Sequence, residues 1–384
     1  MSSSTLTFTV RRCQSELVSP IAPTPREIKL LSNIDDQEGL RFNIPLIFIY
    51  RHEPSMIEKD PVKVLKHSLS QTLVYYYPFA GRIREGDNRK LMVDCNGEGV
   101  MFIEAEADVT LDQFGDTLQP PFPCFQQLLY DAPDIGQIID CPLLHIQVTR
   151  IKCGGFILAL TINHTMCDAS GFKQFMNAWA EMAGGSHQPS IQPIWFREFL
   201  MGREPPHISF NHREYEQLLP NTTKEEDTTT IVHKSFFFTH SHIATIRRLV
   251  PLNLRQCTDF DLITACFWYC HTKAMQLEPN EDVRIMCVVN ARSMFKKINR
   301  SSLVGYYGNC FAFPAAVTTA GKLCGNSLGY AVELIRKAKS KVTEEYMYSV
   351  ADLMSIKEHC LYTTVRSCFV SDLTRAKFVE VDFG

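Results

Sequence analysis

The chain has 384 residues, of which 45% are hydrophobic and 21% charged, the proportions of a folded globular protein rather than a disordered one. Its formal net charge of -3 at pH 7, with no basic run, argues against a nucleic-acid partner. The amino-terminal residues lack the basic start and apolar run of a signal peptide, and no stretch is long enough to span a bilayer, so we expect a cytoplasmic protein with no membrane partner.

The early part of the chain alternates strand and helix patterns. The apolar run from Ile44 to Tyr50 predicts a strand. A helix is expected to begin at Pro61 and end near Tyr76, with four buried positions: Val62, Leu65, Leu69 and Leu73. Asn96-Gly97 then stands between two apolar runs, at 91–95 and 100–104, and predicts a hairpin.

The most informative stretch is an uninterrupted apolar run from Phe156 to Asn163. It predicts a strand covered on both faces. An alternating strand at 144–149 precedes it, and Cys153-Gly154-Gly155 supplies the turn between the two. Apolar residues from Phe172 to Ala183 recur at helical spacing, so a strand is expected to deliver His164 to its junction with a helix.

His164 is a candidate general base, because imidazole is the side chain whose ordinary pKa best suits proton transfer near neutral pH. A buried histidine bonded only to backbone is the alternative interpretation. A metal site would need three protein ligands, and the sequence near His164 offers no convincing third ligand beyond the distant His145, so no metal is expected. His145 itself is either structural or lines a cleft.

Asp168 follows His164 by four residues in apolar surroundings, where a carboxylate needs a cation or several donors. Arg292 ends a second predicted strand, at 285–292, and is the best candidate partner. We therefore expect an Asp168–Arg292 ion pair that fixes the turn carrying His164.

The chain is too long for one ordinary core, so two domains are expected. Residues 186–230 contain several prolines and a polar run at 221–230, which is typical of a connector. The expected domains are 1–185 and 231–384, joined by an interdomain crossover connector at 186–230. The 14 cysteines include no Cys-x-x-Cys pair, which favours reduced thiols in the core.

The second half is expected to resume order at 231–238. Thr258 has the position of a helix N-cap, and four apolar residues predict the buried stripe of that helix: Phe260, Ile263, Phe267 and Cys270. A long amphipathic helix is predicted from about Leu328 to Met347, and a last strand at 365–370.

One rival catalytic pattern is present. Gly325-Asn326-Ser327-Leu328-Gly329 matches the nucleophile elbow of serine hydrolases, which requires a strand running directly into the serine. The preceding residues, 318–324, have the composition of a loop, so Ser327 is interpreted as the cap of the next helix. The downstream Asp352 and His359 leave little chain for a hydrolase sheet.

Several stretches together resemble the plant BAHD acyltransferases, which use acyl-CoA and carry His-x-x-x-Asp and a carboxy-terminal Asp-Phe-Gly-Trp-Gly. The sequence is most similar to the alcohol acyltransferases that make volatile esters, including benzyl alcohol benzoyltransferases. The resemblance covers the whole chain and lies in these ordered stretches: 17–25, 76–82, 93–99, His164-Thr-Met-Cys-Asp168, 261–265, 289–292, 306–309 and 370–375.

The resemblance implies an α/β fold of the chloramphenicol acetyltransferase type, with two domains of mixed sheets and flanking helices around a channel. It implies an O-acyltransferase that moves an acyl group, acetyl, other aliphatic or benzoyl, from CoA to an alcohol, without a covalent acyl-enzyme. His164 would be the base, and Asp168 would pair with Arg292. Thr258 and Ser371 would lie along the CoA path, with Asp382 in a supporting position.

The resemblance also implies acyl-CoA as co-substrate, no permanently bound cofactor, and a monomer. The final motif stops at Asp382-Phe383-Gly384, without the family's next residues, so a truncated chain with an incomplete second domain is expected. A catalytically inactive member that binds only CoA or a partner is the alternative. A serine hydrolase using Ser327 is the less favoured one.

Overall fold

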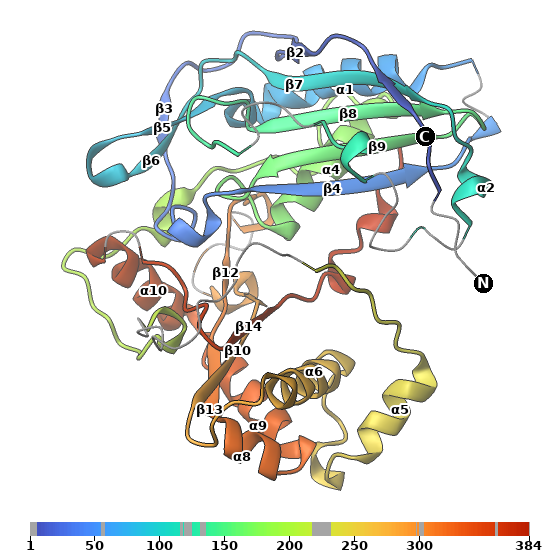
Figure 1. The fold of residues 1–384 in the computed structure, drawn as a ribbon. Helices are drawn as coiled ribbons and strands as arrows, with labels where there is room; N and C mark the ends of the chain where they lie inside the picture. The colour runs from blue at the N-terminus through green and yellow to red at the C-terminus, as the bar shows by residue number, and fades with distance from the viewer. Residues whose placement is uncertain are drawn as a thin grey trace.

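We describe the protein from a computed structural model, which describes residues 6–54, 58–115, 118, 125–130, 136–216, 232–296, 298, 303–357 and 360–383. The molecule has two halves, one above the other in Figure 1, and each is built on a main β-sheet of its own. Within the described part of the chain, no helix is both long and apolar enough to cross a membrane.

The first half is built on a sheet of strand order β1-β7-β8-β9-β4, with β2 also paired to β7. Strands β7 and β8 are parallel and the other neighbours antiparallel. The strands span Val10–Arg12 (β1), Glu16–Val18 (β2), Asn43–Tyr50 (β4), Val100–Ala107 (β7), Leu144–Ile151 (β8) and Phe156–Asn163 (β9). The predicted strands at 44–50, 144–149 and 156–163 are confirmed.

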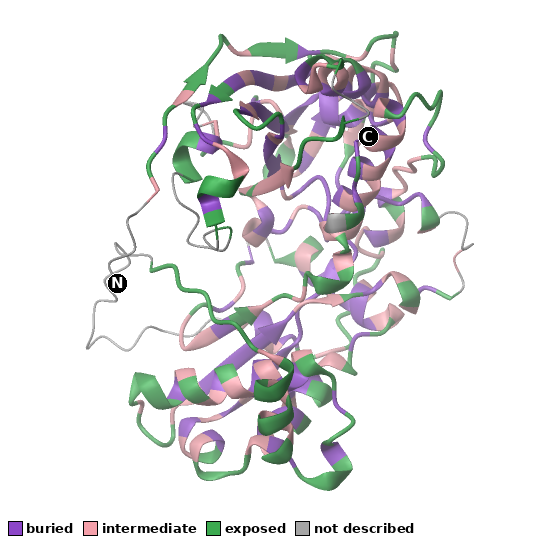
Figure 2. Ribbon diagram, turned by 90° about the vertical axis from the view of Figure 1, so that its right-hand side faces the viewer, coloured by how far each residue is buried: buried purple, intermediate pink, exposed green. Residues whose placement is uncertain are grey.

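Helices α1 (Pro61–Tyr75) and α4 (Ala169–Ala183) pack on one face of this sheet. All four predicted positions of α1 are buried, and the Asp60 side chain caps the helix at Val62 N. Strand β9 is buried on both faces, as its apolar run predicts. Figure 2 shows buried residues in purple in the interior of both halves, with exposed residues in green on the outer helices and loops. Two short helices, α2 (Leu111–Phe114) and α3 (Phe125–Leu128), lie near the opposite face, where Phe114 and Leu128 form a smaller core.

The hairpin predicted at Asn96-Gly97 is wrong. Strand β6 (Leu91–Asp94) pairs with β3 (Ile28–Leu30) and β5 (Arg82–Glu85) in a separate small sheet, whereas β7 belongs to the large sheet. Gly97 does turn, with φ +66°, but the turn carries the chain from one sheet to the other. The real hairpin joins β5 to β6, and its tight turn at 86–90 places Asn88 and Arg89 at positive φ.

The second half is built on the sheet β13-β10-β14, covered by helices. The strands are Asp282–Cys287 (β10), Ala315–Thr319 (β13) and Ser367–Val370 (β14), with a two-stranded ribbon of Val289–Asn290 (β11) and Phe311–Ala312 (β12). The helices are His240–Arg248 (α5), Asp259–Met275 (α6), Ala320–Gly325 (α8), Leu328–Lys339 (α9) and Glu344–Ile356 (α10).

Three expectations for this half are wrong in detail. The helix predicted at 328–347 is two helices, because Thr343 starts α10 by accepting a hydrogen bond from Tyr346 N. Helix α6 buries Leu262, Ala265 and Trp268 instead of the predicted stripe. Residues 232–238 are exposed and belong to no helix or strand, so the structure expected to resume there begins with α5 at His240; residue 231 lies outside the described residues.

The strand predicted at 285–292 is interrupted after Cys287, so that Arg292 follows the short strand β11. The last described residues cross back to the first half, where the C-terminus is marked in Figure 1, and Phe383 packs edge-on against Trp179 at 5.1 Å between ring centroids. The expected boundaries at 186–230 stay a prediction, because 217–231 lie outside the described residues.

Candidate active site

His164 directly follows β9, and its backbone continues the sheet. His164 N donates to Phe42 O at 2.9 Å, just before β4 begins. The turn then tightens around Asn163, whose side-chain oxygen accepts from the backbone N and hydroxyl of Thr165 at 3.0 and 2.6 Å. Because β9 is buried on both faces, its end is held rigidly, and His164 itself is half-buried.

Two aromatic rings flank the imidazole. Phe42 meets it edge-on at 5.4 Å between centroids, and Phe311 lies at 6.0 Å. Burial lowers the pKa of His164 from the ordinary 6.5, and the negative charge of Asp168 offsets part of that effect. The side chain is therefore a neutral imidazole at pH 7, which is the form that can accept a proton.

Asp168 caps α4, and both its carboxylate oxygens accept hydrogen bonds from the protein. Its two oxygens accept five hydrogen bonds within 3.0 Å, from Ser170 N, Gly171 N, Cys310 N and the two terminal nitrogens of Arg292. The predicted ion pair with Arg292 is thus present, at 2.7 Å. Burial alone would raise the pKa of Asp168, but the Arg292 charge and these hydrogen bonds lower it below 3.8.

Gly171 is required where α4 begins. A Cβ atom at this position would stand 1.8 Å from the backbone oxygen of Tyr307, which belongs to the second half of the chain. Only glycine allows this approach. The close approach also lets Cys310 N donate to Asp168 at 3.0 Å. Gly171 is therefore needed so that the two halves can pack together at the turn.

A second buried ion pair holds the same turn, and the sequence did not reveal it. Asp35 and Arg197 are both fully buried, with Arg197 Nη1 2.8 Å from Asp35 Oδ1. Arg197 Nη2 donates to Met166 O at 2.7 Å, inside the turn between His164 and Asp168. The two partners are 162 residues apart, Asp35 in a turn and Arg197 at the start of a four-residue 3-10 helix, so no periodicity marks either as buried.

The other predicted site residues take no part in the contacts of the turn described above. Thr258 is exposed at the N-cap of α6, and its hydroxyl accepts from Asp261 N at 3.1 Å. Ser371 is exposed directly after β14, whose last residue Val370 accepts a hydrogen bond from Val288 N. Asp382 is exposed between two buried residues that pack on the first half of the molecule.

Ser327 does not meet the requirement of a nucleophile elbow. Helix α8 ends at Gly325 just before it, where the elbow needs a strand, and Ser327 is the N-cap residue of α9. Residues 318–324, expected as a loop, contain the end of β13 and most of α8. The proposed partner Asp352 is buried and accepts from Arg203, while His359 lies outside the described residues.

A serine, histidine and glutamate do align elsewhere. His212 Nε2 lies 2.8 Å from Ser349 Oγ, and His212 Nδ1 lies 3.0 Å from Glu214 Oε1. Ser349 is fully buried and its hydroxyl also accepts from two backbone N–H groups, at Ser209 and Phe210. We interpret this group as structural, because it fastens the segment before residue 217 to α10.

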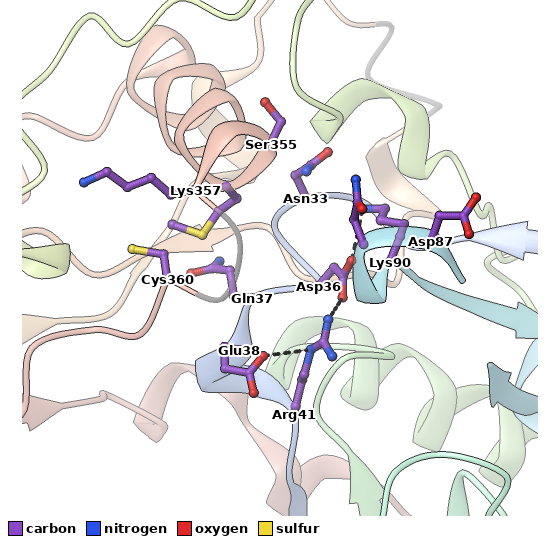
Figure 3. A pocket seen from close by; sticks show the side chains of 12 residues that line it. Asn33, Asp36, Gln37, Glu38, Arg41, Asp87, Lys90, Ser355, Lys357 and Cys360 are labelled. Atoms are coloured by element: carbon purple, nitrogen blue, oxygen red, sulfur yellow. Dashed lines mark hydrogen bonds and ion pairs between the residues drawn. The ribbon is translucent and has the colours of Figure 1, made fainter. Parts of the chain in front are cut away.

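A polar pocket of about 230 Å³ opens between the segment after β3, the β5–β6 turn and the end of α10 (Figure 3). Its buried charges neutralise one another: Asp36 pairs with Arg41 at 2.8 Å and with Lys90 at 3.3 Å. Among the described residues, no three His, Cys, Asp or Glu side chains are grouped to hold a metal ion. We place the candidate site at His164 on the contacts of its turn described above.

Comparison with known proteins finds the same architecture. The model of the Transferase family matches residues 8–384. The benzyl alcohol O-benzoyltransferase of Nicotiana tabacum is 58% identical over 382 residues, covering 100% of this chain and 82% of the relative.

Two solved structures share the fold. Vinorine synthase matches with a TM-score of 0.70 at 21% identity, covering 98% of this chain and 86% of that one. F. graminearum TRI101, complexed with coenzyme A and T-2 mycotoxin, matches with a TM-score of 0.65 at 14% identity, covering 93% and 86%.

Replacing Arg292 with alanine should destabilise the fold. Asp168 would keep its three backbone donors but lose its counter-charge, and breaking a buried ion pair typically costs about 3–5 kcal/mol. Urea denaturation of the wild type and Arg292→Ala measures the loss. Arg89→Ala is the control, because Arg89 forms exposed ion pairs expected to contribute less than about 1 kcal/mol. Equal, small losses for both variants would contradict the prediction.

Proposed function

This chain belongs to the Transferase family, the BAHD acyltransferases, and from that premise we propose that it transfers an acyl group from coenzyme A to an alcohol with His164 as general base. It is an acyltransferase for groups other than aminoacyl groups. The base assignment is supported by a partly exposed His164, whose pKa is lowered by burial, at the end of a turn held by two ion pairs.

In the proposed mechanism, the alcohol hydroxyl donates to Nε2 of His164. The imidazole takes the proton as the alcohol oxygen attacks the thioester carbonyl carbon. The tetrahedral intermediate then expels the sulfur, the imidazolium returns its proton to the thiolate, and the products are an ester and free CoA. The alcohol attacks the thioester directly, so no side chain becomes acylated.

Asp168 takes no direct part in proton transfer in this mechanism, because both its carboxylate oxygens already accept hydrogen bonds from the backbone and from Arg292. Its proposed role is to hold the turn and to place a negative charge near the imidazolium that forms. We keep Thr258 and Ser371 as proposed contacts of the acyl-CoA. The coenzyme A bound in the TRI101 complex and the benzyl alcohol for which the tobacco relative is named support this substrate pair.

Purified protein incubated with benzoyl-CoA and benzyl alcohol should release free thiol and form an ester. His164→Ala should lower kcat by about 10²–10⁴-fold, the usual contribution of a general base. The matched control is His67→Ala, an exposed histidine on α1, which should retain wild-type turnover. CoA affinity, measured by calorimetry, should be the same in all three proteins.

Two results would contradict this proposal. A wild type that binds CoA without turning over would favour the inactive binder. A mass increase of one benzoyl group on protein incubated with benzoyl-CoA alone would show a covalent intermediate.

The pH profile should carry the signature of His164. Its pKa is lowered chiefly by burial, and the neutral form is the active one, so activity is present above this pKa and is lost as pH falls through it. We expect kcat/KM for benzyl alcohol, measured at saturating benzoyl-CoA, to fall on the acid side with a midpoint below 6.5. Benzyl alcohol does not ionise in this range, so the midpoint belongs to the enzyme complex. A midpoint above 6.5 would argue against His164 as the base.

The aromatic surroundings of His164 support an aromatic substrate. Phe42 is 48% exposed beside the imidazole, so its ring is available to a bound substrate. Aromatic pairs contribute about 0.5–1.5 kcal/mol, so Phe42→Ala should lower kcat/KM for benzyl alcohol about 2–10-fold relative to hexanol. Phe267→Ala, which removes a ring that is 47% exposed on α6, is the control. Equal effects of Phe42→Ala on both alcohols would remove the aromatic preference.

A further inference from the structure

Two buried polar atoms beside the turn lack hydrogen-bond partners among the described residues: Nδ1 of His164 and Oδ1 of Asn309. The first can carry a proton, and the second can only accept one. Buried polar groups in native proteins are nearly always paired, so complementary unpaired atoms on two residues already in contact point to each other.

The orientation of the Asn309 amide is fixed by its neighbours. Nδ2 donates to Asp35 Oδ1 at 2.8 Å and to the backbone oxygen of His164 at 2.9 Å. A carbonyl oxygen can only accept, and so can Asp35, a carboxylate paired with Arg197. Rotating the amide by 180° would set oxygen against oxygen at both contacts, so Oδ1 is the atom left over.

Asn309 is also held from the backbone side. Its own N–H donates to Asp35 Oδ1 at 2.9 Å, and the residue is fully buried. The amide therefore has little freedom to move away from the imidazole. Burial lowers the pKa of His164, and the backbone at His164 and Cys167 and the Asn309 side chain each act to raise it, which places the Asn309 amide beside the imidazole.

We propose that Asn309 is a positioning residue that accepts a hydrogen bond from Nδ1–H of His164 and so holds the tautomer with a free lone pair on Nε2. This inference rests on the proposed function, in which Nε2 takes the alcohol proton. The hydrogen bond strengthens as the imidazolium forms, because a charged donor binds an amide oxygen more tightly. Asp168 is the other side chain that favours the imidazolium, through its charge.

The tautomer can be measured directly in the wild type. Protein labelled with ¹⁵N-histidine gives ring nitrogen shifts that distinguish protonated from unprotonated nitrogens, and His164→Gln assigns the His164 signals by their loss. Above the pKa of His164 we expect a protonated Nδ1 and an unprotonated Nε2. A predominant Nε2–H form would overturn the proposal, whether or not the protein turns over.

Kinetics of Asn309→Ala give the second readout. We expect kcat to fall about 10–100-fold at similar KM values, with a mixture of His164 tautomers, because the wrong tautomer cannot act as base. Tyr330→Phe is the control: it removes a hydroxyl that lies 2.8 Å from Thr318 Oγ1, between α9 and β13, and leaves the contacts of Asn309 in place, so kcat should stay within about twofold.

The outcomes separate this inference from the function on which it rests. Wild-type kcat and an unchanged tautomer in Asn309→Ala would overturn the role of Asn309 and leave acyl transfer standing. A wild type without any turnover would refute the proposed function, and the tautomer measurement would still decide the hydrogen bond. If Asn309→Ala does not fold, the wild-type tautomer decides alone.

Discussion

The structure around the candidate site depends on one requirement: the buried carboxylate of Asp168 must be compensated. Its donors come from its own helix and from two segments of the second half, at Arg292 and Cys310. A carboxylate with these donors stays ionised and caps α4, which closes the turn after β9. The two halves therefore meet at the turn. The turn keeps its shape only when the second half packs against the first.

Both the local sequence and contacts with distant residues determine the conformation of this turn. The local sequence builds a buried strand, a tight turn through Asn163, and a helix with a glycine in its first turn. Distant residues then fix the backbone, since Asn309 bonds the carbonyl of His164 and Arg197 bonds that of Met166. A general base must be held within a fraction of an ångström of its partner, and contacts of this kind provide that precision.

Much of this arrangement could be predicted from the sequence, and the reasons for the misses are physical. Strand β9 was predictable from its uninterrupted apolar run and helix α4 from its helical spacing of apolar residues. The Asp168–Arg292 pair was predictable because a carboxylate in apolar surroundings needs a cation, and Arg292 follows the other apolar strand pattern. Helix α6 is apolar nearly all round, so its period did not reveal that Trp268, and not Phe267, faces the core.

Other misses arise where the chain changes sheet or where charge is buried. Asn96-Gly97 is a genuine turn, but a turn does not specify which sheet the next strand joins. Asp35 and Arg197 are residue types that are usually exposed to solvent. Their charged side chains are buried here because they pair with each other. A buried pair of this kind stabilises a fold little compared with an apolar substitute, because desolvation opposes the attraction. Here the pair fixes the orientation of two groups beside His164. The carboxylate of Asp35 can only accept hydrogen bonds, so the Asn309 amide must turn its NH2 group towards it. The guanidinium of Arg197 can only donate, so the Met166 carbonyl must point towards it.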